Sequence, residues 1–90
     1  MNSTTDPRFW KCYFDLPKSV RDVVWKNYHL WAKDPFHNSL NFKKILDDPP
    51  VWSARCGGDY RAAGVMDGDT IIWFFVGSHA QYDRLIKLMK

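Results

Sequence analysis

Ninety residues are fewer than two domains normally require, so the chain is expected to form a single domain over residues 1–90. Hydrophobic residues make up 46% of it, but the longest apolar run, residues 71–76, is far short of the ~20 residues of a membrane-spanning helix. Thirteen Lys and Arg against ten Asp give a net charge of +3, which favours anionic partners without itself indicating nucleic acid. The first residues contain neither a basic nor an apolar stretch, so no secretion signal is expected and the expected location is the cytoplasm.

The N-terminal part of the sequence predicts one short helix. Residues 1–6 are polar and are expected to be disordered. Aromatic residues spaced by three and four positions over residues 6–14 then predict a helix with Pro7 in its first turn.

A second helix is predicted from Leu16 to Lys33, where apolar residues recur with helical period. Asp15 or Ser19 is the expected N-cap, and Pro35 marks the stop. Residues 34–50 contain prolines and aspartates at both ends and are expected to be mostly an ordered connection.

The C-terminal half predicts three strands and a helix. Val51–Cys56 and Tyr60–Met66 are separated by Gly57-Gly58-Asp59 and are typical of a hairpin, and an apolar strand over residues 70–76 follows the Asp67-Gly68 turn. Because no polar residue alternates within that strand, helices should cover both of its faces. Ser78 is the expected N-cap of a closing helix whose inner face carries four apolar or aromatic side chains, Tyr82, Leu85, Ile86 and Met89.

These elements together predict an α+β fold with two N-terminal helices, a three-stranded antiparallel meander and a C-terminal helix. Two cysteines and three histidines lie too far apart in the sequence for a metal or redox motif, so no metal and no cofactor are expected. Cys12 and Cys56 are interpreted as small core residues.

The hairpin carries the first candidate site. A three-residue loop would place Arg55 directly across from Arg61, and like charges in that position reduce stability by up to about 1 kcal/mol. A bound phosphodiester would explain the pair, because each guanidinium matches two phosphate oxygens. Ion pairs with carboxylates inside the fold, from Asp47, Asp48 or Asp83, are an equal alternative.

A second candidate site lies where the last strand meets the closing helix. A helix start offers free backbone N–H groups to a phosphate, and His79 would stand in that first turn with Tyr82 on the same surface. The alternatives are that His79 is only part of the cap and that Tyr82 belongs to the core. Lys43 and Lys44 could hold flanking phosphates or could simply be solvated.

The motifs WSARCGGDYRAAG, DGD and VGSHAQYDRL, over about forty residues from Val51 to Leu88, resemble the RelE/ParE superfamily of toxins from bacterial type II toxin–antitoxin modules. The resemblance implies a RelE/ParE-like fold, here without its usual first strand, and an antitoxin partner in a toxin–antitoxin hetero-oligomer. RNA-cleaving members enter the ribosomal A site and cut mRNA without a metal, by attack of a ribose 2′-hydroxyl on the adjacent phosphate.

By that resemblance Arg61 is expected to stabilise the phosphate and His79 to act as acid or base, with Tyr82 as a looser catalytic candidate. Arg55 would contact the RNA backbone. Independently of the resemblance, Lys43 and Lys44 of the basic loop and Tyr60 are also expected to contact RNA. RelE has lysines at the positions of Trp52 and Ala54, and a related subgroup uses a Glu that this chain lacks.

The resemblance leaves three functions open. The first is a metal-independent, ribosome-dependent mRNA endonuclease that inhibits translation. The second is a non-enzymatic inhibitor of DNA gyrase, like the ParE branch, and the third is a degenerate member that only binds its antitoxin. Arg55, Arg61 and His79 favour the first, because a gyrase inhibitor needs no phosphate-cleaving group.

Overall fold

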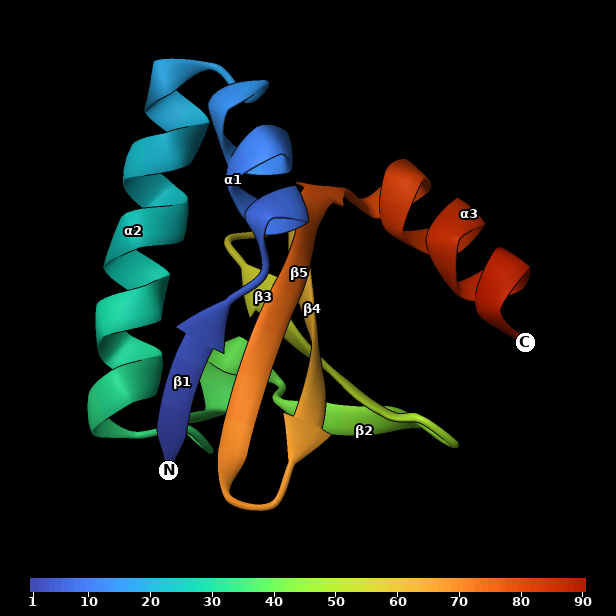
Figure 1. Ribbon diagram of the computed structural model, residues 1–90. Helices are drawn as coiled ribbons and strands as arrows, with labels where there is room; N and C mark the ends of the chain where they lie inside the picture. The colour runs from blue at the N-terminus through green and yellow to red at the C-terminus, as the bar shows by residue number, and fades with distance from the viewer.

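A five-stranded sheet with helices on both faces forms the protein, as seen in a computed structural model that describes residues 1–90 (Figure 1). In chain order the elements are β1 (Asn2–Thr5), α1 (Pro7–Phe14), α2 (Lys18–Lys33), a 3₁₀ turn (Asn38–Leu40), β2 (Lys43–Asp47), β3 (Pro50–Cys56), β4 (Tyr60–Asp67), β5 (Thr70–Ser78) and α3 (His79–Met89). The strand order is β1-β5-β4-β3-β2, with β1 parallel to β5 and the other pairs antiparallel. The predicted α+β class is confirmed, but the strand count of three is wrong.

The first helix forms where the aromatic spacing predicts it. Pro7 occupies its first turn, and the carboxylate of Asp6 accepts a hydrogen bond from the Arg8 backbone N–H at 2.9 Å. The Arg8 side chain donates to the same carboxylate, and this hydrogen bond lowers the pKa of Asp6.

The second helix is also confirmed, but its predicted caps are wrong. It begins after Pro17, which supplies no side-chain hydrogen bond, so neither Asp15 nor Ser19 is the N-cap. Its buried residues, Val24 and Trp31, face the sheet, as the helical period predicts.

The prediction of disorder over residues 1–6 is wrong, because residues 2–5 form the parallel edge strand β1. Asn2 pairs with Thr70 and Thr5 with Trp73. The Asp6 N–H extends the ladder by donating to the Trp73 carbonyl at 2.8 Å. A run of four polar residues shows no apolar alternation, so the pattern that predicts strands cannot detect it.

Residues 34–50 are more than a connection, because they also contain the edge strand β2. Lys43 pairs with Ser53 and Lys44 with Trp52, and a register shift follows before Leu46 pairs with Val51. This irregularity and the mostly exposed side chains hide the period-2 pattern of a strand.

The predicted hairpin and its register are confirmed, with Cys56 opposite Tyr60 and Arg55 opposite Arg61. The β4–β5 register shifts after Ala63, which leaves Phe74 as an extra residue.

Two cores of unequal size lie on the two faces of the sheet. The larger contains eleven buried residues between the sheet and the α1–α2 pair, including Trp31, Trp73 and Cys56. The smaller has three, Val51, Ala63 and Phe74, covered by partly buried side chains of α3. Both cysteines are free, and Cys12 packs half-buried against the larger core, so both act as the core residues that were expected.

Candidate phosphate-binding site

Arg55 and Arg61 form an adjacent pair on the sheet face that α3 partly covers. They lie directly opposite each other on β3 and β4, and Arg61 is in turn opposite Gly77 on β5. Directly opposed residues share one face of a sheet, as do residues two apart in a strand. Ser53 and Ala63 are two positions from Arg55 and Arg61 respectively, and Ala63 belongs to the core on the α3 side. We call Arg55 and Arg61 the arginine pair.

No carboxylate neutralises the arginine pair. The four ion pairs of the protein join Asp6 to Arg8, Asp22 to Lys18, Asp47 to Lys44 and Asp83 to His79. The alternative that Asp47, Asp48 or Asp83 clamps these arginines is therefore wrong.

The two guanidiniums differ in how the chain holds them. One terminal nitrogen of Arg61 donates to the carbonyls of Gly58 at 3.1 Å and of Tyr60 at 2.9 Å. Arg55 has no hydrogen bond of its side chain within the protein, and its Nε is buried without a partner. The terminal nitrogens of Arg55 have no acceptor within the chain, so they are the groups of this side chain that can bind a charged acceptor.

The loop Gly57–Asp59 fixes the start of α3 beside the arginine pair. The His79 backbone N–H donates to the Asp59 carbonyl at 2.8 Å. Ser78 is the N-cap, as predicted, and it forms a capping box with Gln81. The Ser78 hydroxyl accepts a hydrogen bond from the Gln81 backbone N–H, and the Gln81 side chain accepts one from the Ser78 backbone N–H. The chain's own groups therefore occupy the N–H groups of Ser78, His79 and Gln81, so this helix start offers a phosphate fewer free donors than the sequence predicts.

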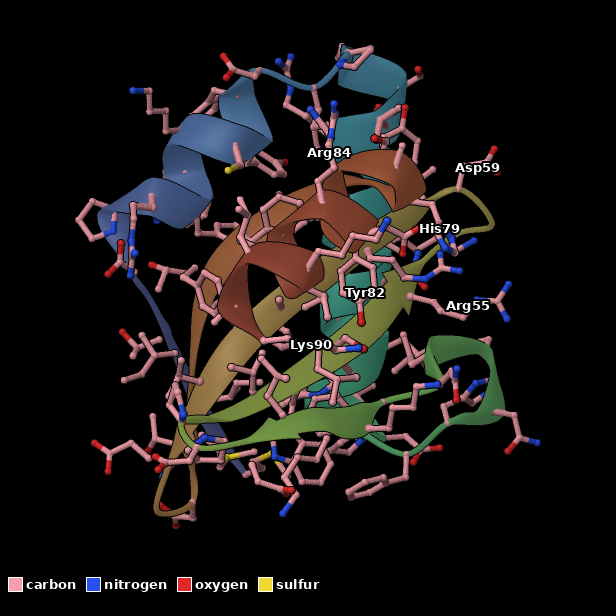
Figure 2. All side chains as sticks on the ribbon, turned by 90° about the vertical axis from the view of Figure 1, so that its right-hand side faces the viewer. Arg55, Asp59, His79, Tyr82, Arg84 and Lys90 are labelled. Atoms are coloured by element: carbon pink, nitrogen blue, oxygen red, sulfur yellow. The ribbon has the colours of Figure 1, made fainter.

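His79 stands at this end of α3 with its side chain exposed. Its Nε2 lies 3.4 Å from Oδ2 of Asp83, and its ring centroid lies 6.3 Å from that of Tyr82. Figure 2 shows Arg55, Asp59 and His79 at the same end of the sheet, with Tyr82 one turn further along α3. Tyr82 is half-buried outside both core clusters, and its hydroxyl has no hydrogen bond within the chain.

Of the other predicted RNA contacts, only Lys43 lies on the face of the arginine pair, because it is opposite Ser53. Lys44 is opposite Trp52, which belongs to the other face, and it pairs with Asp47 at 3.2 Å. Tyr60 packs against the larger core on that other face. The structure thus places Arg55, Arg61 and Lys43 on one face of the sheet, with His79 two residues beyond Gly77, the residue opposite Arg61. It places Lys44 and Tyr60 on the other face.

The i, i+4 spacing of His79 and Asp83 predicts that both lie on one surface of the helix, and the structure pairs them. One further residue that matters at this site, Gly77, has no role assigned from the sequence. Gly77 lets β5 approach the capping box, since a Cβ there would lie 2.7 Å from Oε1 of Gln81. A glycine next to a predicted N-cap is a weak signal for such a contact.

The site has the groups for phosphate binding and proton transfer. Two guanidinium forks can bind the oxygens of a phosphodiester, and an imidazole paired with a carboxylate can accept or donate a proton. No cluster of three or more His, Cys or Asp side chains that could hold a metal ion is present. None of the helices combines the length and hydropathy needed to cross a bilayer.

Comparison with known proteins finds similarity at the level of structure only. No family model matches the sequence, and no curated protein matches it either. Among solved structures, the RelBE2 toxin–antitoxin complex of Mycobacterium tuberculosis matches with a TM-score of 0.68 at 18% identity, covering 88% of this chain and 91% of the other. The archaeal RelE–RelB complex of Pyrococcus horikoshii gives 0.67 at 16%, covering 89% and 96%. The isolated RelE toxin of E. coli gives 0.62 at 17%, covering 99% and 98%.

These matches extend over nearly the whole length of both chains. The RelE/ParE-like fold that the hairpin motifs indicate is therefore confirmed, and the N-terminal strand β1 belongs to it here as well.

Proposed function

We propose that this protein is the toxin of a type II toxin–antitoxin system and a metal-independent endoribonuclease that cleaves mRNA on the ribosome. The arginine pair carries the proposal, because it concentrates two positive charges on one face without any carboxylate to neutralise them. The shared fold with chains described as RelE toxins supports it.

In the proposed reaction the ribose 2′-oxygen attacks the adjacent phosphorus and the bond from phosphorus to the 5′-oxygen breaks. The arginine pair binds the phosphate and stabilises the additional negative charge of the pentacoordinate phosphorane. His79, oriented by Asp83, transfers a proton to or from the reacting oxygens. The products are a 2′,3′-cyclic phosphate and a free 5′-hydroxyl. Tyr82 and Lys43 are proposed to contact the neighbouring nucleotides.

We further propose an antitoxin partner and a cytoplasmic site of action for this single domain. Two structural neighbours are described as complexes of a RelE-type toxin with its antitoxin. An antitoxin segment with acidic residues over the arginine pair would neutralise it and block access of RNA.

The test is induced expression in bacteria with pulse labelling of protein and DNA synthesis, followed by primer extension on cellular mRNA. The wild type is expected to arrest translation first and to leave discrete cuts in translated mRNA. Arg61→Ala and His79→Ala should each relieve the arrest, and loss of one transition-state donor should reduce cleavage about 100-fold or more.

Arg84→Ala is the matched control, because Arg84 lies exposed on α3 without an ion pair and its removal changes the net charge equally. It should keep the full arrest, and thermal unfolding should show that all variants fold. Arrest of DNA synthesis while translation continues would contradict the proposal and favour gyrase inhibition. Arrest that persists in Arg61→Ala and His79→Ala would remove the assigned site.

A further inference from the structure

The two edges of the sheet differ in how they are protected against pairing with another chain. At the β2 edge, Lys43 and Lys44 are exposed, a register shift follows them, and Pro49 comes directly after the strand. Charged side chains, irregular register and proline are means by which an exposed edge avoids a further strand. β1, at the opposite edge, consists of the uncharged residues 2–5 in regular register and has none of these protections.

β1 directs unpaired backbone groups away from the sheet. The N–H groups of Asn2 and Asp6 donate to carbonyls along the β5 side, at 2.9 and 2.8 Å. Because backbone groups alternate in direction along a strand, Ser3 and Thr5 direct their N–H and C=O groups to the outer side. No strand of the chain pairs with that side of β1. Two donors and two acceptors are therefore available there to another strand.

The helices leave this edge open. α1 packs on β5 and α2 packs on β3, so neither lies beyond β1. Figure 1 looks onto the β1 edge, with α2 on its left and α3 on its right, and Figure 2 shows α2 behind the middle of the sheet. A strand of another chain can therefore reach the outer side of β1.

Exposed aromatic side chains border the same edge. The Trp10 indole N–H donates to the Thr5 hydroxyl at 2.9 Å, and the Tyr28 hydroxyl lies 2.9 Å from the Ser3 hydroxyl. Both rings are thus held beside the residues with free backbone groups. Trp10 is 38% exposed, Tyr28 37%, and Trp25, which packs against Tyr28, 52%. We call Trp10, Trp25 and Tyr28 the aromatic rim. Exposed apolar area beside a free strand edge favours contact with another protein.

A second copy of the chain fits this edge in one register. If Thr4 lies opposite Thr4 of the second copy, Ser3 of each copy lies opposite Thr5 of the other. The outward groups of both copies then form four backbone hydrogen bonds. A shift in one direction would place Ser3 opposite Pro7, which has no N–H. A shift in the other direction would place Thr5 opposite Met1, which lies outside β1.

The same register brings the two aromatic rims towards each other. The two-fold axis of an antiparallel strand pair is perpendicular to the sheet, so the α1–α2 layers of both copies lie on the same side of it. The β1 residues carry no charge, so no like charges meet between the two strands. In a symmetric pair one free edge supplies both halves of the interface, whereas a different protein would need a matching edge of its own.

We propose that this protein forms a symmetric homodimer in which the two β1 strands pair antiparallel and join the two sheets into one. The four hydrogen bonds fix the register, and burial of the aromatic rims supplies apolar contact area. The arginine pair lies on β3 and β4, away from β1, so the dimer leaves it open. The proposal does not depend on cleavage of RNA.

The test is sedimentation velocity of the full-length chain from about 1 µM to about 500 µM, a range that covers weak and moderate affinities. The mass of the wild type should rise from that of one chain to that of two chains. Amide exchange of Ser3 and Thr5 should slow as the dimer forms, and exchange in β2 at the opposite edge should not change.

A proline tests the strand pairing. Ser3→Pro removes an outward N–H and leaves the N–H groups that bond to the β5 side intact. Since each dimer loses two hydrogen bonds, association should weaken about tenfold or more. Ser3→Ala is the matched control, because it removes only the hydroxyl and keeps the N–H, and it should associate like the wild type.

Charges at Thr4 test the register. Thr4→Lys places two positive charges opposite each other and should abolish the dimer, as should Thr4→Asp, whereas a mixture of the two variants should form it. Leu88→Lys adds the same charge on α3 at a position that is 85% exposed, and it should leave the dimer intact. Thermal unfolding checks that every variant folds.

Three results would overturn the proposal. They are a wild type that stays monomeric at every concentration, a dimer that persists in both Ser3→Pro and Thr4→Lys, and a mixture of Thr4→Lys and Thr4→Asp that does not associate.

Discussion

At the scale of single residues, Arg55 combines two unfavourable features. It faces another guanidinium across the ladder, and its Nε is buried without a partner. The first destabilises a sheet by up to about 1 kcal/mol, and an unpaired buried donor adds to that cost. A side chain that lowers stability in this way is explained better by a bound anion than by a structural role.

Arg55→Met is therefore expected to leave the free energy of unfolding unchanged or to raise it by up to about 1 kcal/mol, because it removes the repulsion. The same variant should lose most of the RNA-cleaving activity. Urea unfolding measures the first effect. A loss of stability above about 1 kcal/mol would show that Arg55 has a structural role in the isolated protein.

The fold strongly perturbs the thiol of Cys56. Burial raises the pKa of Cys56 from 9.0 to about 12, although the positive charge of Arg61 acts in the opposite direction. Since the thiolate is the reactive form, Cys56 should not react with iodoacetamide at pH 8 in the folded protein. Half-buried Cys12 should react first, as mass spectrometry of the digested protein would show.

The raised pKa of Cys56 also has a defined effect on stability. The folded state holds the thiol proton more tightly than the unfolded state, so this contribution is complete below about pH 9 and decreases as the pH rises towards 12. Cys56→Ala should reduce the alkaline loss of stability. If Cys56 alkylates as fast as Cys12 without unfolding, the described burial is incorrect.

At the scale of elements, the junction of β5 and α3 depends on a glycine. A Cβ at Gly77 would lie 2.7 Å from Oε1 of Gln81 and 2.8 Å from Cζ of Phe75, and Gln81 is the side chain that accepts the Ser78 N–H. Gly77→Ala should therefore displace the capping box, reduce the free energy of unfolding by about 1 kcal/mol and speed amide exchange in the first turn of α3.

Gly58→Ala is the matched control for this substitution. Nothing lies within 4 Å of a Cβ at Gly58, so this variant should be neutral or slightly stabilising. Equal stability and equal exchange rates in α3 for the two variants would contradict the role of Gly77.

Elements differ in how far the sequence specifies them. α2 and the β3–β4 hairpin carry strong local signals, a helical period and a glycine loop between strands, and both were predictable. β1 and β2 form at the edges because an existing strand offers them backbone partners, and their own residues are polar or irregular. Such strands depend on long-range pairing, which a local pattern does not record.

The candidate site, like the secondary-structure elements, was only partly predictable from the sequence. Hairpin register places Arg55 opposite Arg61, and register follows from the loop length. Two other features of the site depend on the positions of side chains, which the sequence pattern does not give. Neither arginine contacts a carboxylate, and the Ser78–Gln81 capping box occupies N–H groups at the start of α3. Lys44 and Tyr60 were assigned to the site from charge and proximity alone, and strand alternation places both on the other face.

At the scale of the whole molecule, the sheet separates two surfaces with different properties. Its α1–α2 face has a large aromatic core with a cavity, and its other face has a small core beside the arginine pair. Figure 1 shows α3 as the only helix on that second face, and none of its residues is fully buried.

The central claim is that Arg55 and Arg61 together bind one phosphate of an RNA strand. The most direct measurement is the titration of ¹⁵N-labelled protein with a short RNA whose 2′-hydroxyls are methylated, so that it binds without being cleaved, while the arginine Nε–H resonances are recorded. The resonances of Arg55 and Arg61 should shift together with the same midpoint, and that of Arg84 should remain almost unchanged. If the RNA binds with neither resonance shifting, or if Arg55→Met binds it with unchanged affinity, the arginine pair is not the phosphate site.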